Sequence, residues 1–460
     1  MSHHQPDPNK SVNLTIDGIP VTVPEGTRIL EAAKKTGINI PTLCEYPELC
    51  KRALCRLCVV ECDGRGKLLA ACANDVWEGV SIVTNNLRIQ NIRKTIIELI
   101  LANHPRDCTF CIRNTKCELQ SLAKRFNIID PLFQNECADR PPSIESETIV
   151  RNMEKCVKCG RCVEACQEVQ TIRAINTSHR SKEYEISTPY GQTLKESLCV
   201  FCGQCASVCP VGAIYEHDQC AEVRASLNDS GRKTIAQVPP SFASALEDVL
   251  SLAAGTITTG KINTAVKLLG FDKVYDMKIA AVSASTEINS EVKARQNGGG
   301  KLPVITGCAE GIGNFVKNFY PDLADRLITE KTARRTFASV IKNGYAKETG
   351  VESSAVTSVS LVPCLAQKYA TEKNKTDFAL TAAEFARMIN LAGIIIETLP
   401  DEQFDAVNAE LPKQDNSVKK ETVCGFAQGR KIMEAIREGK CDADWVEILS
   451  CPSGKCRQDI

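Results

Sequence analysis

The sequence predicts a multidomain chain of mixed α+β and α/β class, with small cysteine-rich modules in the N-terminal half and a larger α/β domain in the C-terminal half. The first observation is the placement of cysteine: 15 of the 25 cysteines, with one histidine, form four groups at metal-ligand spacing between Cys44 and Cys209. The second is the texture of the chain after about residue 226, where apolar β-rich runs alternate with helical stretches. Such alternation is typical of a sheet covered by helices.

A length of 460 residues is compatible with several domains. The changes in cysteine density and in periodicity predict four domains, with bounds at 1–85, 86–140, 141–222 and 226–460.

Charge balance and cysteine usage exclude several classes of protein. The 56 basic and 56 acidic residues cancel, which argues against a nucleic-acid partner or a membrane surface. Most cysteines crowd into short-range motifs instead of spreading as loop-closing pairs, so a secreted disulfide scaffold is not expected. The polar start and the lack of a long apolar run predict neither a signal peptide nor a membrane span. We therefore expect a cytoplasmic chain.

The first domain is predicted to contain a hairpin, a helix and the first ligand group. Alternating apolar residues flank an Asp17-Gly18 turn, and the helical segment 27–35 is closed by Gly37. With these elements before it, the ligand group resembles the plant-type 2Fe-2S ligation of β-grasp ferredoxins, although the first two cysteines are further apart here. Two thiol pairs holding zinc are the alternative. The group consists of Cys44, Cys55, Cys58 and Cys72.

The second ligand group follows a predicted amphipathic helix whose apolar face contains Ile89, Ile92, Ile96 and Leu99. The group consists of His104, Cys108, Cys111 and Cys117. Alone, it is also compatible with a zinc knuckle. After a 2Fe-2S domain, it resembles the 4Fe-4S site with one histidine and three cysteine ligands of the large peripheral-arm subunit of respiratory complex I and of iron-only hydrogenases. A neutral imidazole in place of a thiolate removes a negative charge, which should shift the reduction potential.

Two copies of a C-x2-C-x2-C-x3-C run are the most specific signal in the chain. This duplication resembles bacterial two-cluster ferredoxins, in which the last cysteine of each run serves the other cluster. The resemblance implies one 4Fe-4S cluster on Cys156, Cys159, Cys162 and Cys209. It implies another on Cys199, Cys202, Cys205 and Cys166.

The segment from 226 onward is predicted to be an α/β domain. Its β-rich runs are 234–238, 302–305, 356–362 and 445–449, and its clearest helical stretches are 241–254 and 382–392. Three of the runs are closely followed by a cysteine, namely Cys308, Cys364 and Cys451. Because open α/β sheets usually bind ligands at the carboxyl ends of their strands, these thiols are candidates for a site.

Most of the segment 234–456 resembles the catalytic domain of iron-only (FeFe) hydrogenases. The stretches 255–276, 297–300 and 429–440 have the look of that family, as do the three cysteine motifs, and 297–300 is also expected to form a turn. The order of the four domains resembles the hydrogenase subunit of multi-subunit NAD-linked enzymes. In that family the active site is a 4Fe-4S cluster held by four cysteines, one of which also bridges to a two-iron unit.

The first two cysteine motifs depart from the family pattern. In the first, T-S-C-C-P-x-W in the family, Cys308 stands at the proton-relay position and Ala309 at the ligand position. In the second, Cys364 is kept as a ligand candidate. Gln367 there replaces a lysine that contacts the two-iron unit, and Ala370 replaces a glutamate.

The third motif has Lys455 at the bridging-thiolate position and Cys456 displaced by one position. Together the three motifs predict a chain without hydrogenase activity and without catalytic residues of its own. Two hypotheses remain for the retained thiols: they are buried side chains that pack as small apolar groups, or they hold a possible fifth cluster, a 4Fe-4S cluster on Cys308, Cys364, Cys451 and Cys456. Simple packing is expected for Cys50, Cys62, Cys137, Cys220, Cys424 and Cys441, which have no partner at ligand spacing.

The cofactors expected on this chain are therefore one 2Fe-2S cluster and three 4Fe-4S clusters, with a possible fourth 4Fe-4S cluster. The sequence contains no G-x-G-x-x-G after a strand and no P-loop, so flavin is expected only on partner subunits. A flavin splits a hydride into two single electrons, and one-electron clusters carry them apart.

The whole pattern is similar to the hydrogenase-like subunit of Stn-type electron-bifurcating transhydrogenases, which exchange electrons among NADH, ferredoxin and NADP(H). This resemblance implies four partners: a flavin and NADH-binding subunit, a thioredoxin-like 2Fe-2S subunit, an NADP(H)-binding flavoprotein subunit and ferredoxin. The alternatives are a subunit of a NAD-linked FeFe hydrogenase, a complex I-like peripheral subunit, and a hydrogen or redox sensor.

Overall fold

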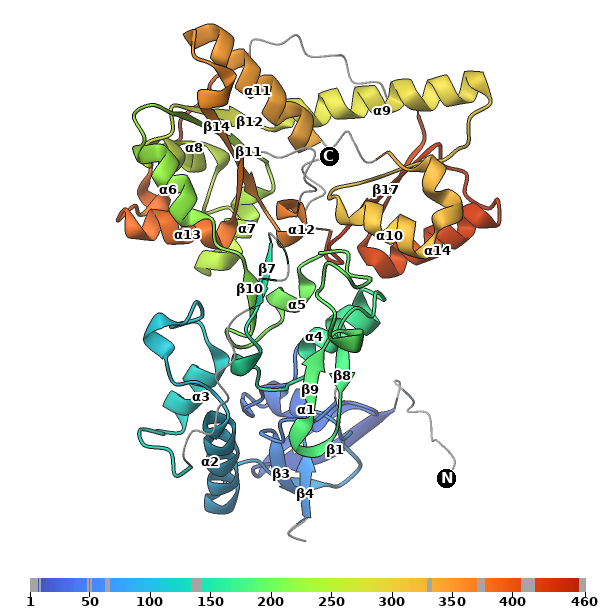
Figure 1. Ribbon diagram of the computed structural model, residues 1–460. Helices are drawn as coiled ribbons and strands as arrows, with labels where there is room; N and C mark the ends of the chain where they lie inside the picture. Colours follow the sequence, from blue (N-terminus) through green and yellow to red (C-terminus); the bar gives the residue numbers. More distant parts are fainter. Residues whose placement is uncertain are drawn as a thin grey trace.

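The computed structural model describes residues 7, 10–47, 49, 52–62, 67–133, 143–144, 146, 148–328, 333–369, 377–406 and 418–454. In Figure 1 the N-terminal modules lie at the bottom, a module of short elements lies in the middle, and the C-terminal half lies at the top. Within the described ranges, no helix has the length and apolar character needed to cross a membrane.

The N-terminal module is a five-stranded mixed sheet with strand order β2-β1-β5-β3-β4, in which β1 pairs antiparallel with β2 and parallel with β5. Its elements are β1 (Ser11–Ile16), β2 (Ile19–Pro24), α1 (Ile29–Lys35), β3 (Val59–Cys62), β4 (Lys67–Ala70) and β5 (Ser81–Val83). The predicted hairpin and helix are therefore confirmed. Gly18 has a φ of 79° at the hairpin turn, and Gly37 has a φ of 80° just after α1, both in the left-handed region.

Two helices follow this sheet, α2 (Leu87–Ala102) and α3 (Glu118–Arg125). The prediction for the buried face of α2 is partly wrong. Leu99 is 47% exposed, and the covered face passes through Arg93 and Ile97. The guanidinium of Arg93 donates hydrogen bonds to the carbonyl oxygens of Leu57 and Val59, at 3.0 and 2.7 Å. The helix is turned to satisfy this buried cation, which an apolar period cannot reveal.

The middle module contains an antiparallel sheet of order β10-β7-β6 and the hairpin β8-β9. Its two short helices, α4 and α5, each begin after a left-handed glycine at the same place in a cysteine run, Gly160 and Gly203. The elements are β6 (Ser143–Ile144), β7 (Ile149–Arg151), α4 (Arg161–Glu164), β8 (Asn176–Ser178), β9 (Glu185–Ser187), α5 (Gln204–Ser207) and β10 (Ile214–Glu216).

The C-terminal half contains two separate parallel sheets, whereas the sequence predicted one α/β domain. The first has the order β12-β11-β14-β15 and the second β13-β17-β16. In Figure 1 the first sheet lies at the upper left and the second at the upper right.

The first sheet and its helices comprise α6 (Cys220–Asn228), β11 (Lys233–Val238), α7 (Phe242–Leu250), α8 (Thr259–Leu268), β12 (Lys273–Asp276), α9 (Lys278–Gly298), α11 (Ala333–Thr349), β14 (Val356–Val362), α12 (Leu365–Lys368), β15 (Phe378–Thr381) and α13 (Ala382–Leu391). The second sheet and its helices comprise β13 (Val304–Gly307), α10 (Gly311–Phe319), β16 (Lys420–Cys424), α14 (Gly425–Arg437) and β17 (Trp445–Leu449).

The four predicted strands of this half are confirmed as β11, β13, β14 and β17, although β13 begins only at Val304. Two predicted helix boundaries were too generous, because α7 ends at Leu250 and α13 at Leu391. The turn predicted at 297–300 starts late, since α9 continues through Gly298. The gap between the third and fourth predicted domains, residues 222–226, lies inside helix α6. The buried face of this helix packs into the core of the first parallel sheet.

Candidate iron-sulfur centres

The first ligand group converges beside the five-stranded sheet. The sulfur atoms of Cys58 and Cys72 lie 3.3 Å apart. Hydrogen bonds with Cys55 and then Cys72 lower the pKa of Cys44 to about 2, whereas contacts with Cys44 and Cys58 raise the pKa of Cys72. Four sulfurs this close can bind one multivalent metal centre together, and their protons are displaced to solvent when the thiolates bind it.

The second group places His104 near three thiols of different exposure: Cys108 is exposed, Cys111 half-buried and Cys117 buried. Burial, together with the nearby ammonium of Lys155, lowers the pKa of His104 to about 4. The imidazole is therefore neutral at pH 7 and keeps a lone pair for a metal. Among the described residues, its buried Nδ1 has no hydrogen-bond partner. A buried nitrogen without a hydrogen-bond partner fits a histidine side chain that binds a metal ion.

The middle module closes this second group from one side. A β-carbon at Gly212 would lie 2.7 Å from the sulfur of Cys111, so only glycine leaves room for that thiol. Beside it, the Nζ of Lys155 forms an ion pair with Asp107 at 2.8 Å. Because Lys155 directly precedes Cys156, this contact joins the second group to the third.

The two cysteine runs of the middle module share one local backbone geometry. In each, the residue two positions after the first cysteine has a positive φ, 54° at Lys158 and 50° at Phe201. This conformation turns the N–H of that residue toward the sulfur of Cys156 or Cys199, at 3.4 Å in both runs. Hydrogen bonds to sulfur are one means by which proteins set the potential of iron-sulfur clusters. The repeat in sequence is thus a repeat in structure.

Two small cavities divide the eight sulfurs of these runs into two sets. Each cavity is otherwise lined mostly by apolar side chains, and the fourth cysteine of each run lies with the other run. One cavity is lined by Cys156, Cys159, Cys162 and Cys209. The other is lined by Cys166, Cys199, Cys202 and Cys205.

Burial makes these thiols poor sites for an isolated negative charge. It raises the pKa of Cys156 to about 11 and those of Cys159 and Cys202 to about 12. A thiolate here is costly unless a bound cation compensates it. Iron in a cluster is such a cation, and soft thiolate ligands suit it. The donor sets therefore fit the ligation of 4Fe-4S clusters.

The four groups are connected through a continuous series of apolar cores. One core contains Cys55, Cys117 and Cys156, and so joins the first three groups. A second core joins the third and fourth groups within the middle module. A third packs Cys199 and Cys202 against side chains of β13, β17 and α10. The ligand groups thus follow one another from the N-terminal sheet to the C-terminal half.

The three described thiols of the possible fifth ligand set, Cys308, Cys364 and Cys451, lie at the carboxyl ends of strands, as predicted, after β13, β14 and β17. The N–H of Ser450 donates to the sulfur of Cys308 at 3.3 Å, which places β13 beside the loop that contains Cys451. Burial raises the pKa of Cys308, and the nearby Cys364 adds to this effect. Cys364 also lies close enough to Cys202 of the fourth group to add to the rise in its pKa. The structure therefore brings these thiols to the region where both parallel sheets meet the middle module.

Two residues that replace hydrogenase motif positions are buried near these thiols. Ala309 is 6% exposed and Gln367 is 7% exposed, and neither can supply a thiolate or a cation. Lys455, Cys456 and Ala370 lie outside the described residues.

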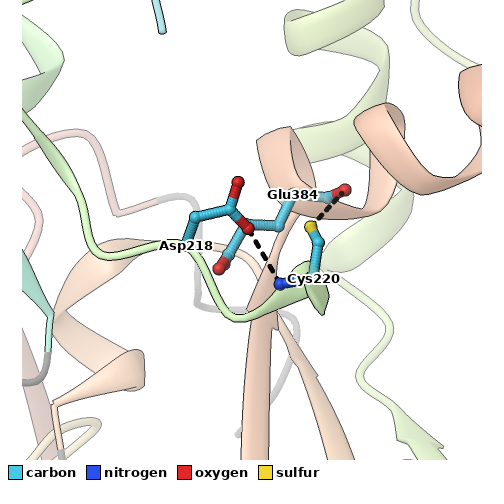
Figure 2. Close-up of side chains that lie close together, drawn as sticks. All are labelled: Asp218, Cys220 and Glu384. Carbon is cyan, nitrogen blue, oxygen red and sulfur yellow. Dashed lines mark hydrogen bonds between the residues drawn. The ribbon is translucent and has the colours of Figure 1, made fainter. Parts of the chain in front are cut away.

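A further set of potential ligands, not predicted from the sequence, consists of Asp218, Cys220 and Glu384 (Figure 2), whose donor atoms all lie within 4.8 Å of one another. The N–H of Cys220 donates to Asp218 at 2.8 Å, and its thiol donates to the carbonyl of Glu384 at 3.4 Å. The ammonium of Lys368 forms an ion pair with Glu384, and both side chains are almost completely buried. Because the chain supplies its own cation, this set is explained as a structural joint between α6, α12 and α13.

The sequence analysis missed the polar residues that join the ligand groups. Lys155 and Arg161 each directly precede a cysteine of the third group, and Gln170 follows Cys166 of the fourth group by four positions. The only signal was a charged or amide side chain in a segment otherwise rich in cysteine and apolar residues. Ligand spacing identifies metal donors and gives no information about the groups that support them.

Family models match four consecutive segments of the chain. They describe a 2Fe-2S iron-sulfur cluster binding domain at 9–87, the iron-sulfur binding region of NADH-ubiquinone oxidoreductase G at 93–131, a 4Fe-4S dicluster domain at 155–213, and the C-terminal domain of the iron-only hydrogenase large subunit at 232–413. The chain thus contains a 2Fe-2S domain and 4Fe-4S domains followed by a hydrogenase-like domain, and the predicted fold class is confirmed.

Curated relatives agree with this order. Subunit HndD of the NADP-reducing hydrogenase of Solidesulfovibrio fructosivorans is 36% identical, over 86% of this chain and 71% of the relative. Iron hydrogenase 1 of Clostridium pasteurianum is 28% identical over the same shares. Subunit alpha of the NADPH-Fe(3+) oxidoreductase of Geobacter sulfurreducens is 34% identical over 44% of this chain and 24% of the relative. The chain is therefore an iron-sulfur subunit related to those of NAD(P)H-linked oxidoreductases and hydrogenases, and it belongs to the iron-only hydrogenase large-subunit family.

Proposed function

We propose that this chain is the electron-relay subunit of a flavin-based electron-bifurcating complex that exchanges electrons among NADH, ferredoxin and NADP(H), and that it has no hydrogenase activity. The observation that carries the proposal is the unbroken series of ligand groups and shared cores from Cys44 to the C-terminal thiols. A relay needs closely spaced carriers, and four ligand groups in contact provide them.

In this proposal four sets of side chains hold clusters, and each cluster supplies a one-electron carrier. Cys44, Cys55, Cys58 and Cys72 hold a 2Fe-2S cluster, because their sulfurs converge from the segment before β3 and the segment after β4. The other three sets hold 4Fe-4S clusters: His104, Cys108, Cys111 and Cys117; Cys156, Cys159, Cys162 and Cys209; and Cys166, Cys199, Cys202 and Cys205.

The proposed lack of hydrogenase activity follows from the buried replacements in the C-terminal half. Ala309 removes a thiolate ligand and Gln367 removes the cation expected near the two-iron unit. Both positions are buried, so neither water nor a mobile surface side chain can replace the missing thiolate or the missing cation there. What this half retains is its contact with the fourth group, which suits a docking and support role.

The metal content tests the cluster assignments. Anaerobically purified protein should contain about 14 iron atoms per chain, which corresponds to one 2Fe-2S and three 4Fe-4S clusters. A value near about 18 would show that the C-terminal thiols hold a further 4Fe-4S cluster. Zinc in place of iron at Cys44, Cys55, Cys58 and Cys72 would contradict the first assignment.

Hydrogen turnover tests the second part of the proposal. The protein should be matured together with the hydrogenase assembly machinery and examined by infrared spectroscopy. We expect no carbonyl or cyanide stretching bands and no production or consumption of hydrogen. Clear bands together with turnover would refute the proposed lack of activity.

The relay role is tested by removing one cluster. Cys202→Ser places a hard oxygen where a cluster needs a soft thiolate, so it should damage the fourth group. In the assembled complex, coupled electron exchange among NADH, ferredoxin and NADP(H) should fall strongly, while the flavin subunit still passes electrons from NADH to an artificial acceptor. Cys441→Ser is the matched control, because Cys441 belongs to no ligand group. Full coupled activity without the fourth cluster would rule out the relay.

The proposed partners are a flavin and NADH-binding subunit, a thioredoxin-like 2Fe-2S subunit, an NADP(H)-binding flavoprotein and ferredoxin. The NAD(P)H-linked complexes of the relatives support this set. Native purification followed by identification of the co-purifying subunits tests it. Recovery of the chain without any flavoprotein would contradict it.

A further inference from the structure

Arg161 occupies a central place among the first three ligand groups. It is the first residue of α4, directly before Cys162, and its side chain is only 3% exposed. Its two terminal nitrogens donate to the two carboxylate oxygens of Glu118, at 2.6 and 2.7 Å. Glu118 directly follows Cys117, so this bidentate pair ties the third ligand group to the second.

Two further contacts extend this connection. The guanidinium lies 5.3 Å from the ring centroid of Tyr46, two residues after Cys44 of the first group. One of its terminal nitrogens also approaches the carbonyl oxygen of Val208, at 3.5 Å, directly before Cys209. A single guanidinium therefore contacts segments that carry ligands of three different groups. Its planar fork of five donors is what makes several such contacts possible.

The charge of Arg161 also acts on the ligand sulfurs. Although burial opposes it, the carboxylate of Glu118 raises the pKa of Arg161, and the sulfurs of Cys159 and Cys44 add to this effect. Glu118 compensates the positive charge only in part, because its side chain is 45% exposed and is screened by water. The buried ligand groups therefore experience a net positive potential from the Arg161–Glu118 pair.

We infer that Arg161 is a positioning residue that fixes the first three ligand groups relative to one another, and that its buried charge raises the reduction potentials of the clusters they hold. This inference rests on the proposed relay function. Reduction adds negative charge to a cluster, so a nearby cation stabilises the reduced state. Lys155 forms a comparable ion pair with Asp107, with side chains 10% and 46% exposed, and the buried carboxylate of Glu164 is paired with the half-exposed Arg52. Substituting Arg161 alone leaves both of these pairs in place, so the change in potential reports the charge of Arg161.

The test is an EPR-monitored redox titration of the full-length, cluster-loaded protein, with iron content measured for each variant. Arg161→Gln should lower the equilibrium constant for reduction of the 2Fe-2S cluster roughly tenfold. For a one-electron couple this lowers the midpoint potential by about 59 mV. Glu118→Gln should raise it, because it removes the compensating carboxylate. The double variant should lie between the two single ones, and Arg161→Lys should stay near the wild type because it keeps the charge.

The fourth group serves as the internal control, since the contacts of Arg161 are with Glu118, Tyr46 and Val208 and not with the ligands of that group, and its potential should shift less than that of the 2Fe-2S cluster. The inference is overturned if Arg161→Gln leaves the 2Fe-2S midpoint unchanged at full iron content, or if both single variants shift it in the same direction. If Arg161→Gln fails to retain iron, Glu118→Gln decides alone, and an unchanged midpoint there overturns it. A wild-type chain without iron-sulfur signals would instead refute the proposed relay function, which keeps the two failures distinct.

Discussion

Gln170 is the side chain that most directly joins the fourth ligand group to the C-terminal half. It lies four residues after Cys166, and it is completely buried. Its amide nitrogen donates to the carbonyl oxygen of Ser450 at 2.8 Å, and its amide oxygen accepts from the N–H of Phe426 at 3.1 Å. Both partners belong to buried residues at the end of the second parallel sheet.

Gln170→Ala should therefore leave two buried backbone groups without partners. Each such group costs about 1–3 kcal/mol, so the expected loss is about 2–6 kcal/mol in the stability of the contact between the middle module and the second sheet. For a unit of about 200 residues, 1 kcal/mol lowers the melting temperature by about 2–4 °C. The unfolding transition of the C-terminal half should accordingly fall by at least about 4 °C.

Anaerobic thermal unfolding of the cluster-loaded protein, followed by circular dichroism and by cluster absorbance, provides the measurement. Gln167→Ala is the matched control: its amide makes one hydrogen bond, to Ile175 at 3.2 Å, within the middle module. That variant should lose no more than about 1.5 kcal/mol. If Gln170→Ala loses less than its control, the contact between the two halves is not held by this amide and the reasoning fails.

Two other variants test further contacts of the C-terminal half. A β-carbon at Gly311 would lie 1.9 Å from the backbone oxygen of Val200, so Gly311→Ala should destabilise the junction by about 1–3 kcal/mol in chemical denaturation, whereas Gly344→Ala, with open space around it, should be neutral or stabilising. Lys368→Met leaves the buried carboxylate of Glu384 unpaired and should cost about 3–5 kcal/mol in the same measurement, with much of the loss recovered when Glu384→Gln is added. Equal stability of the single and double variants would contradict the ion-pair explanation.

Much of the secondary structure was predictable because its signals are local. The hairpin of β1 and β2 follows from alternation around a left-handed turn, and β14 and β17 are rich in β-branched and other apolar residues and are buried along their whole length. The covered face of α2 was not predictable, because Arg93 takes an inward position only when the carbonyls of Leu57 and Val59 are there to receive it. The division of the C-terminal strands into two sheets depends on pairings between distant segments, and no local pattern encodes them.

The candidate site divides in the same way. The sequence by itself determined the ligand triplets, because three of the four donors in each ferredoxin-like set come from one short loop whose geometry is fixed by spacing. The resemblance to two-cluster ferredoxins also implied the exchange of Cys166 and Cys209 between the runs, and the two cavities group the sulfurs in the same way. Only the tertiary structure decided that the thiols after β13, β14 and β17 meet beside the fourth group. It alone also revealed Arg161 and Gln170, because a polar side chain becomes a joint only when distant chain segments surround it and exclude water.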